Sequence, residues 1–200
     1  MAIRAGELRE RVEVLTLVQT ETGYAWQADG SLWAKVEKTS AKNLFSSIGL
    51  GAPTVRFVLR ARPLTLHQAL RLRGQHCFLT EIAPLPENRL YLAVTAAVIE
   101  PVLCTVTRRT KTVDPETLRP TLQPAQTQEF PACCTEKYIK LTEGMPNDAV
   151  ARALVLVTPK AIGLRVGEVV RMGGEAYRVQ TVHDLDPYKN EYEVLREEDA

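Results

Sequence analysis

The sequence of 200 residues has little of what common enzyme classes and zinc proteins need. It contains neither a GxxxxGK[ST] nor a GxGxxG motif, so it lacks the usual phosphate-binding loops. Its four cysteines show no CxxC spacing, whereas a structural zinc site usually takes its four ligands from spaced pairs. We therefore expect reduced thiols, no bound metal and no cofactor. The cysteines are Cys77, Cys104, Cys133 and Cys134.

Long apolar runs are also missing. The most apolar stretch, Leu90–Ile99, ends at Glu100 and Pro101 and is too short to span a bilayer as a helix. The first residues lack a basic segment followed by a long apolar run, which a secretory signal needs. We expect no contact with a membrane.

The spacing of the histidines and acidic residues in the sequence matches no common catalytic site. The histidines, His67, His76 and His183, stand apart from the Ser/Asp or Cys pairings that hydrolases use. The acidic residues around His183, in HDLDPYKNE, could bind a divalent cation, but Asp-Pro and Lys-Asn pairs are typical of a polar hairpin turn. We expect that the protein is not an enzyme.

Charge is balanced overall and uneven along the chain. Residues 1–110 hold 14 Lys and Arg against 9 Asp and Glu, a net +5, while residues 111–200 hold 11 against 15, a net −4. Neither half is basic enough to indicate nucleic-acid binding by charge alone. Aromatic residues make up only 6% of the chain, too few to favour a stacking platform for single strands.

The patterns that are present indicate β-structure. Helical periodicity is nearly absent, and short runs rich in β-branched and apolar residues recur between turn residues. Residues 145–154, MPNDAVARAL, could add one helical turn. The expected strands cover approximately Val12–Gln19, Leu32–Lys38, Val55–Arg62, Ala69–Arg73, Cys77–Ala83, Arg89–Ile99, Ala153–Thr158, Val169–Met172, Ala176–His183 and Glu191–Arg196.

Composition divides the chain. Residues 105–131 hold several prolines and many threonines but little bulk hydrophobe, which is typical of a linker or extended arm. The sequence therefore predicts an all-β protein with a small antiparallel β-barrel or sandwich domain at 1–104, a Pro- and Thr-rich linker at 105–131 and a second small β-barrel-like domain at 132–200.

The two β-rich halves show the same order of parts. Aligning them puts Gly74 opposite Gly174, and it puts Leu79 and Ile82 opposite Val179 and Val182. Such a pattern arises from an internal repeat, and equally from two unrelated small barrels that converged. The sequence leaves both explanations open.

Several segments of the first half carry a family resemblance. They are GELRERVEVL near the N-terminus, SLWAKVE around Trp33, TVRFVLRAR with Arg60, and LRLRGQHCFLTEI leading into RLYLAV. In order and spacing over roughly residues 5–100, about half of the chain, they resemble the phage head-closure or head–tail joining proteins, also called head–tail adaptors or connectors.

The resemblance implies a structural virion protein of the neck of a tailed phage or prophage. Such a protein assembles in the bacterial host cytoplasm as a homo-oligomeric ring below the portal, closes the DNA-filled head and joins it to the tail. The implied partners are the portal or a portal adaptor, the tail terminator or other neck proteins, and further copies of the chain. DNA would pass through the channel without sequence-specific binding. A tail-completion or stopper protein and a small-barrel nucleic-acid-binding module remain as alternatives.

One candidate interaction segment is the connection Lys38–Thr54, which is long for a link between two strands. Its apolar side chains either fold back onto the barrel or insert between neighbouring subunits or toward the channel, and we favour insertion. These side chains are Leu44, Phe45, Ile48 and Leu50.

Arginines form a second candidate surface. Strand alternation puts Arg56, Arg60 and Arg62 on the face opposite Phe57 and Leu59. They are either a solvated face or a basic surface for an acidic protein partner, since arginine pairs well with carboxylates.

The N-terminal segment is the third candidate. Ile3, Arg4, Leu8 and Arg9 precede the first expected strand and combine apolar and basic side chains. They either fray, followed by one helical turn, or form an arm that orders on docking to the portal side of the neck.

Overall fold

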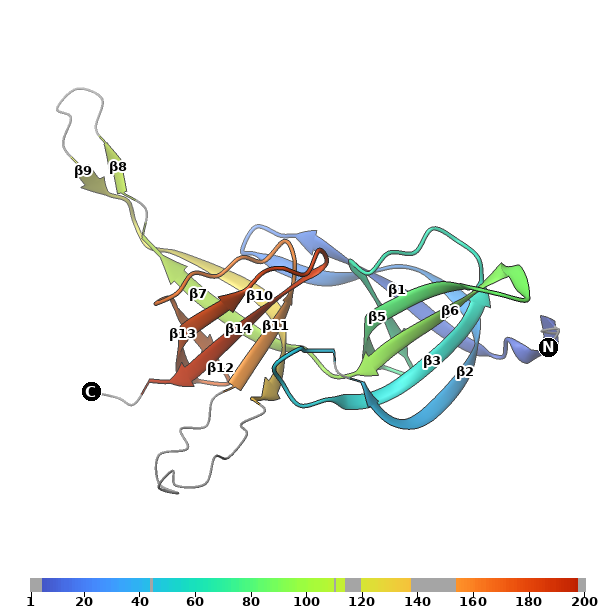
Figure 1. The fold of residues 1–200 in the computed structure, drawn as a ribbon. Coiled ribbons are helices and arrows are strands. Elements are labelled where there is room, and N and C mark those ends of the chain that lie inside the picture. The colour runs from blue at the N-terminus through green and yellow to red at the C-terminus, as the bar shows by residue number, and fades with distance from the viewer. Residues whose placement is uncertain (1–4, 44, 110, 114–119, 138–153, 198–200) are drawn as a thin grey trace, which may run out of the picture.

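A computed structural model gives the fold and describes residues 5–43, 45–109, 111–113, 120–137 and 154–197. The chain is built almost entirely of antiparallel strands, apart from one short 3-10 turn, η1 (Ala5–Glu7). The strands form two closed six-stranded barrels and one two-stranded hairpin (Figure 1). This confirms the all-β prediction, and it resolves the choice between barrel and sandwich in favour of barrels.

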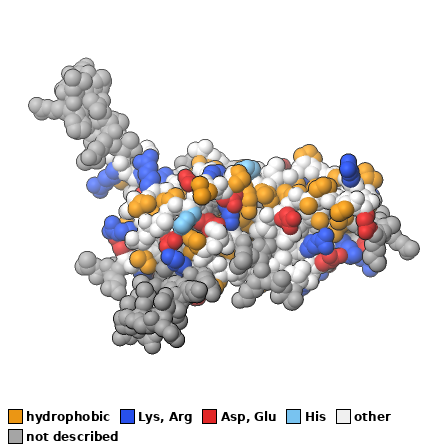
Figure 2. Space-filling view, in the orientation of Figure 1, with side chains coloured by type: hydrophobic (Ala, Val, Ile, Leu, Met, Phe, Trp, Pro, Cys, Tyr) orange, Lys and Arg blue, Asp and Glu red, His pale blue; other side chains and the backbone are white. Residues whose placement is uncertain are grey.

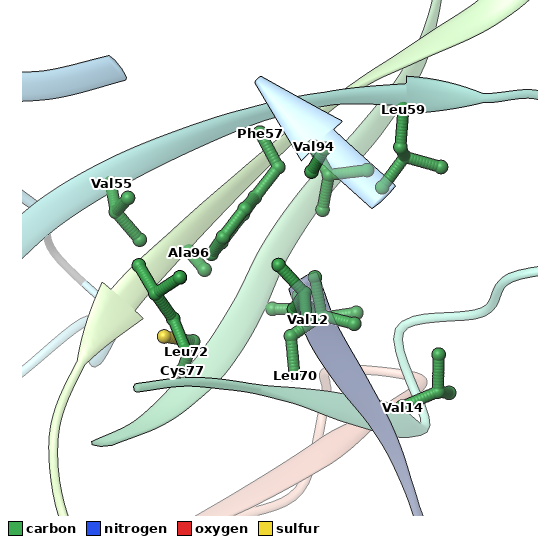
Figure 3. Close-up of a cluster of buried hydrophobic side chains, with 12 residues drawn as sticks. Val12, Val14, Val55, Phe57, Leu59, Leu70, Leu72, Cys77, Val94 and Ala96 are labelled. Atoms are coloured by element: carbon green, nitrogen blue, oxygen red, sulfur yellow. The ribbon is translucent and has the colours of Figure 1, made fainter. Parts of the chain in front are cut away.

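The first barrel takes the strands in the order β1-β2-β3-β6-β5-β4. Alternation along the strands turns one side chain in two inward, and Val12, Val14 and Phe57 are fully buried inside (Figure 3). The six strands are β1 (Glu10–Gln19), β2 (Tyr24–Asn43), β3 (Ala52–Arg60), β4 (Gln68–Leu72), β5 (Gln75–Leu85) and β6 (Asn88–Val98).

The second barrel takes its strands in the order β10-β11-β14-β13-β12-β7. Phe130, Leu156 and Tyr192 fill its interior. Between β7 and β10, the short hairpin of β8 (Lys111–Val113) and β9 (Pro120–Leu122) projects away from both barrels (Figure 1). The barrel strands are β7 (Val102–Arg108), β10 (Gln126–Glu136), β11 (Leu154–Pro159), β12 (Val169–Met172), β13 (Glu175–His183) and β14 (Lys189–Arg196).

The two barrels have the same strand order when β1 is matched with β7, β2 with β10, β3 with β11, and β4–β6 with β12–β14. Registers agree as well: Leu72 pairs with Gln75 across the β4–β5 turn, and Met172 pairs with Glu175 across the β12–β13 turn. The β5–β6 and β13–β14 ladders both shift register one residue after the positions aligned from sequence, Leu79 and Val179. Shared order, turns and bulges favour a true repeat over convergence.

The segment expected to be a linker, residues 105–131, contributes both of its ends to the second barrel. Its first residues continue β7, and its last residues belong to β10, which pairs with β7 from Gln126 onward. Threonine suits strands because its branched side chain packs well on a pleated surface. A barrel strand needs only alternate apolar residues, and Val106 and Phe130 supply them here. The composition was therefore a misleading sign of a linker.

Strand ends also differ from expectation in the first barrel. Because β2 continues to Asn43 and β3 begins at Ala52, the long connection expected at Lys38–Thr54 is much shorter. The helical turn expected at residues 145–154 lies outside the described residues, except for Leu154, which begins β11. Within the described part of the chain, no helix is long and apolar enough to cross a membrane.

Candidate interaction surfaces

A groove opens at the end of the first barrel that lies away from the second barrel, near the N-terminus in Figure 1. It has a volume of about 550 Å³. Trp33 is its largest apolar side chain: alternation on β2 buries Ala34 inside the barrel and turns Trp33 outward, where 58% of its surface is exposed. The lining residues are Leu8, Leu32, Trp33, Arg60, Ala61 and Arg62. The sequence segment SLWAKVE drew attention to Trp33, but sequence reasoning did not select it as a site residue.

The groove brings together residues from two of the expected surfaces. Leu8, from the N-terminal segment, is half-buried in it, while Arg60 and Arg62 are exposed along its rim. Among the described residues, no ion pair involves either arginine. Figure 2 shows hydrophobic side chains exposed on both barrels, interspersed with charged ones. Two unpaired guanidinium groups beside an exposed indole form a surface suited to a protein partner that offers carboxylates or carbonyls.

Arg56 lies on the same outer face of β3 but belongs to an ion-pair network. Its guanidinium lies 3.8 Å from Glu37, and the ammonium of Lys35 lies 3.3 Å from Glu37 and 3.1 Å from Glu7. Hydrogen bonds that the ammonium of Lys35 donates to the carboxylates of Glu7 and Glu37 raise the pKa of Lys35. Arg56 therefore has an ion-pair partner in the described part of the chain, where Arg60 and Arg62 have none.

The remaining residues of the expected N-terminal arm are only partly described. Arg9 is exposed, and its Nε donates a hydrogen bond to the carbonyl of Gly6 at 2.8 Å. Ile3 and Arg4 lie outside the described residues.

A second surface with a defined geometry is the junction between the two barrels. Phe45 is fully buried there and packs with Ala52 and Phe78 of the first barrel and with Val155 and Val157 of the second. Its ring centroid lies 6.0 Å from that of Phe78, in a tilted arrangement.

The burial of Phe45 corrects the expectation that it inserts between subunits, because its partner surface lies in the same chain. Ile48 packs against the same cluster, whereas Leu50 keeps 38% of its surface exposed. Leu44 lies outside the described residues. The sequence could indicate that this loop meets an apolar surface, but it could not show which barrel supplies that surface.

A buried ion pair lies beside Phe45. Glu191 is 3% exposed and Lys189 is 5% exposed, and their charged groups lie 2.8 Å apart. The hydroxyl of Ser46 donates to Glu191 at 2.6 Å, as does the backbone N–H of Ser47 at 3.0 Å, and Lys189 donates to the carbonyl of Phe45. Two charges on the second barrel thus hold the β2–β3 loop of the first.

The electrostatics of Glu191 follow from these contacts. Burial alone would raise the pKa of Glu191, but hydrogen bonds from Lys189, Ser46 and Ser47 outweigh burial and keep the pKa below its ordinary value. Sequence reasoning treated this stretch as a turn and missed the pair. The available signal was a lysine and a glutamate two residues apart on a β-strand, which therefore share a face.

Backbone contacts complete the junction. The N–H of Glu129 donates to the carbonyl of Thr22 at 2.9 Å, and that of Leu50 donates to the carbonyl of Glu136, also at 2.9 Å. Gly23 permits the first of these approaches: a Cβ at this position would lie 1.9 Å from the carbonyl oxygen of Glu129. The two barrels are therefore joined by backbone hydrogen bonds, an apolar cluster and a buried ion pair.

Two of the residues considered for metal binding, Asp186 and Glu191, lie beside the ammonium of Lys189, at 4.0 Å and 2.8 Å. His183 lies 3.2 Å from Glu193, and the described residues hold no group of three or more His, Cys, Asp or Glu side chains placed for a metal ion. Burial raises the pKa of Cys133 and of Cys104 to about 12, so these thiols are protonated at neutral pH.

Comparisons with known proteins give partial structural likenesses. No protein-family model and no curated protein matches the chain. The solution structure of protein SF1141 from Shigella flexneri 2a is similar over 48% of this chain and 96% of its own, with 24% identity and a TM-score of 0.37. A chain from the virion of a native gene transfer agent particle is similar over 44% of this chain and 92% of its own, with 22% identity and a TM-score of 0.34. Both TM-scores are too low to support an argument about this chain.

Proposed function

We propose that this chain is a structural protein of the neck of a tailed phage or prophage, which forms a ring below the portal, closes the DNA-filled head and joins it to the tail. Its partners in this role are the portal or a portal adaptor on one side and tail-terminator or other neck proteins on the other. The ring leaves a channel through which DNA passes without sequence-specific contacts, and the protein acts through its surfaces rather than as an enzyme.

The observation that carries the proposal is the coincidence of the sequence resemblance with one complete barrel. The segments that resemble head-closure proteins lie within residues 5–100, and the first barrel runs from β1 at Glu10 to the end of β6 at Val98. The end of this barrel carries the groove lined by Trp33, Arg60 and Arg62, with the N-terminal Leu8 inside it. A closed barrel with an exposed apolar and basic end has the features of a building block for assembly.

A binding measurement with the portal protein of the same phage or prophage tests the proposal. Immobilised portal is expected to retain the full-length chain, and deletion of residues 1–7 is expected to weaken retention about tenfold, which corresponds to about 1.4 kcal/mol. The thermal midpoint of the deletion variant should stay close to that of the full chain, because the barrel strands begin at Glu10. Failure of the full chain to bind the portal at any concentration tested would contradict the proposal.

A further inference from the structure

The groove at the end of the first barrel has a counterpart inside the chain. At the junction of the two barrels, the segment Pro159–Ala161 of the second barrel lines a cleft whose other wall belongs to the first barrel. That wall consists of Thr16 and Leu17 on β1 and of Pro63, Thr65, His67 and Gln68 before and at the start of β4.

The repeat shows which residues correspond in the two barrels. Leu72 and Met172 occupy equivalent places beside the β4–β5 and β12–β13 turns, and they pair with Val12 on β1 and Cys104 on β7. On the neighbouring strands, Val12 pairs with Leu32 and Cys104 pairs with Phe130. Leu32 is therefore equivalent to Phe130, and the next residues, Trp33 and Pro131, are equivalent to each other.

The same reasoning extends to the other wall of the groove. Two residues beyond Trp33, Lys35 pairs with Val58, and two beyond Pro131, Cys133 pairs with Val157. Arg60 and Pro159 each follow two residues later, so Arg60–Arg62 correspond to Pro159–Ala161. The groove of the first barrel and the cleft at the junction are therefore formed by equivalent residues of the two repeated barrels.

The two equivalent sites differ in exposure: the site on the second barrel is covered, and the site on the first barrel is open. Pro131 and Pro159 are buried in the second barrel, whose outer face meets the first barrel. Their equivalents are open: Trp33 is 58% exposed, and Arg60 is exposed without an ion-pair partner among the described residues.

The covering surface is also repeated. In the first barrel, the segment that faces the cleft includes a turn in which the N–H of Thr65 donates to the side chain of Gln68 and the N–H of Gln68 donates to the carbonyl of Thr65. Arg165 and Glu168 of the second barrel make the same two bonds, 100 positions later in the sequence. Val166, inside this second turn, is 65% exposed.

Barrel 1 also touches barrel 2 through its β1–β2 turn at Thr20–Gly23. In the second barrel, the equivalent connection runs from β7 to β10 and carries the projecting β8–β9 hairpin (Figure 1). The second barrel therefore repeats two of the elements with which the first barrel covers its neighbour, the turn before β4 and the β1–β2 connection.

We propose that the groove around Trp33 binds the second barrel of another copy of this chain, in a head-to-tail contact that repeats the junction between the barrels. The Arg165–Glu168 turn of one copy covers Trp33, Arg60 and Arg62 of the next. That these contacts build a closed ring rests on the proposed function. Each chain would then contribute two barrels to the ring. Because the contact joins different surfaces, it propagates from copy to copy and closes into a ring when the rotation allows.

Net charge supports this direction of contact. Counted by barrel, residues 1–100 hold 12 Lys and Arg against 9 Asp and Glu, a net +3, and residues 101–200 hold 13 against 15, a net −2, so unlike barrels of successive copies carry opposite net charge.

Sedimentation velocity on the purified full chain, without portal, tests the contact. The wild type is expected to form species larger than a dimer as its concentration rises toward about 1 mM, the range of a weak specific interface. Trp33→Glu and Val166→Glu should each abolish this growth. Leu185→Glu is the matched control, since Leu185 is 99% exposed but belongs to neither surface, and it should assemble like the wild type.

Mixing the two defective variants gives the sharpest result. A Trp33→Glu chain keeps an intact Val166 surface and a Val166→Glu chain keeps an intact groove, so an equal mixture should form heterodimers and nothing larger. Circular dichroism and thermal midpoints should match the wild type, because both side chains are exposed.

A wild-type chain that remains monomeric up to about 1 mM, or a mixture of variants that remains monomeric, would overturn the head-to-tail contact. Self-dimers of Val166→Glu would also overturn it and would indicate a two-fold contact between grooves. Portal retention is measured separately, so the proposed function can hold when the head-to-tail contact fails.

Discussion

Glu191 is a carboxylate with almost no exposed surface, and its partners come from both barrels. Lys189 lies beside it on β14, while Ser46 and Ser47 reach it from the β2–β3 loop. Burying two charges costs free energy, which the close pairing and the additional hydrogen bonds offset. The arrangement fixes the orientation of the loop, because a shift of Ser46 would leave a buried carboxylate without its donors.

Replacing one member of this pair should therefore be costly. Glu191→Gln leaves the ammonium of Lys189 buried and is expected to lower the free energy of unfolding by about 3 kcal/mol, in denaturant titration at pH 7. Glu175→Gln is the control, because Glu175 pairs with Arg196 on the surface and should contribute less than about 1 kcal/mol. An equal effect of the two changes would show that the buried pair does not stabilise the junction.

His76 predicts a pH dependence. It is 3% exposed, its Nε2 has no hydrogen-bond partner among the residues that the structure describes, and burial lowers its pKa to about 4. Between pH 6.5 and 4 the unfolded chain takes up a proton that the folded chain refuses, so stability falls as the pH falls through this range. The full loss from this group is about 3 kcal/mol, at about 1.4 kcal/mol for each pH unit.

Unfolding titrations at pH 7.5 and pH 5 check this prediction. The wild type should lose stability at the lower pH, and His76→Gln should lose clearly less. Glu191 does not affect the comparison of pH 7.5 with pH 5. Because its pKa is lowered in the folded chain, its contribution to stability is lost only as the pH falls below its ordinary value of 4.5. If the exposed control His67→Gln removed the acid sensitivity and His76→Gln did not, the assignment to His76 would be wrong.

Among the elements, the β1–β2 hairpin depends on a close backbone approach to β10. Gly23→Ala would put a Cβ 1.9 Å from the carbonyl oxygen of Glu129, so the hairpin must move away and lose its hydrogen bond to β10. We expect a loss of about 1–3 kcal/mol in the free energy of unfolding, in the range of other forced shifts of packed groups.

Gly163→Ala is the control for this change, because nothing lies within 4 Å of a Cβ at that position. Its stability should remain within about 0.5 kcal/mol of the wild type. Comparable losses for the two variants, measured by chemical denaturation, would indicate that the hairpin does not need its contact with β10.

Most elements could be predicted from alternation and turn residues. Val169–Met172 was predicted with its observed bounds, and Val12–Gln19 differs from β1 only by two residues at its start. The strands β7 and β10 were missed because threonine and proline made their composition resemble that of a linker, although the barrel needs them to close. Strand composition is local, whereas barrel closure depends on residues far apart in the sequence.

The candidate surface could be predicted only in part for the same reason. Leu8, Arg60 and Arg62 were identified as interaction residues, and the structure brings them into one groove. Phe45 was also identified, but it is buried against the second barrel. An apolar loop residue signals an interface, and only the tertiary structure shows whether that interface lies within the chain.

At the scale of the whole molecule, closure of both barrels limits how copies can associate. A closed barrel has no free edge strand, so copies cannot join by extending the sheet of either barrel. Contacts between barrels must come from turns, loops and outward-facing side chains, which are the groups that form the junction between the two barrels. The tandem arrangement thus supplies one complete barrel–barrel contact in every chain. It leaves two unpaired surfaces, the groove on the first barrel and the covering turn on the second, for contact with other copies of the chain.

The central claim is a ring of these tandem barrels on the portal, and electron microscopy of portal complexes incubated with the full-length chain tests it most directly. The account predicts a ring stacked on the portal in which first and second barrels alternate, with Trp33 covered by the second barrel of the neighbouring chain. Portals that remain bare at saturating protein concentration would contradict it.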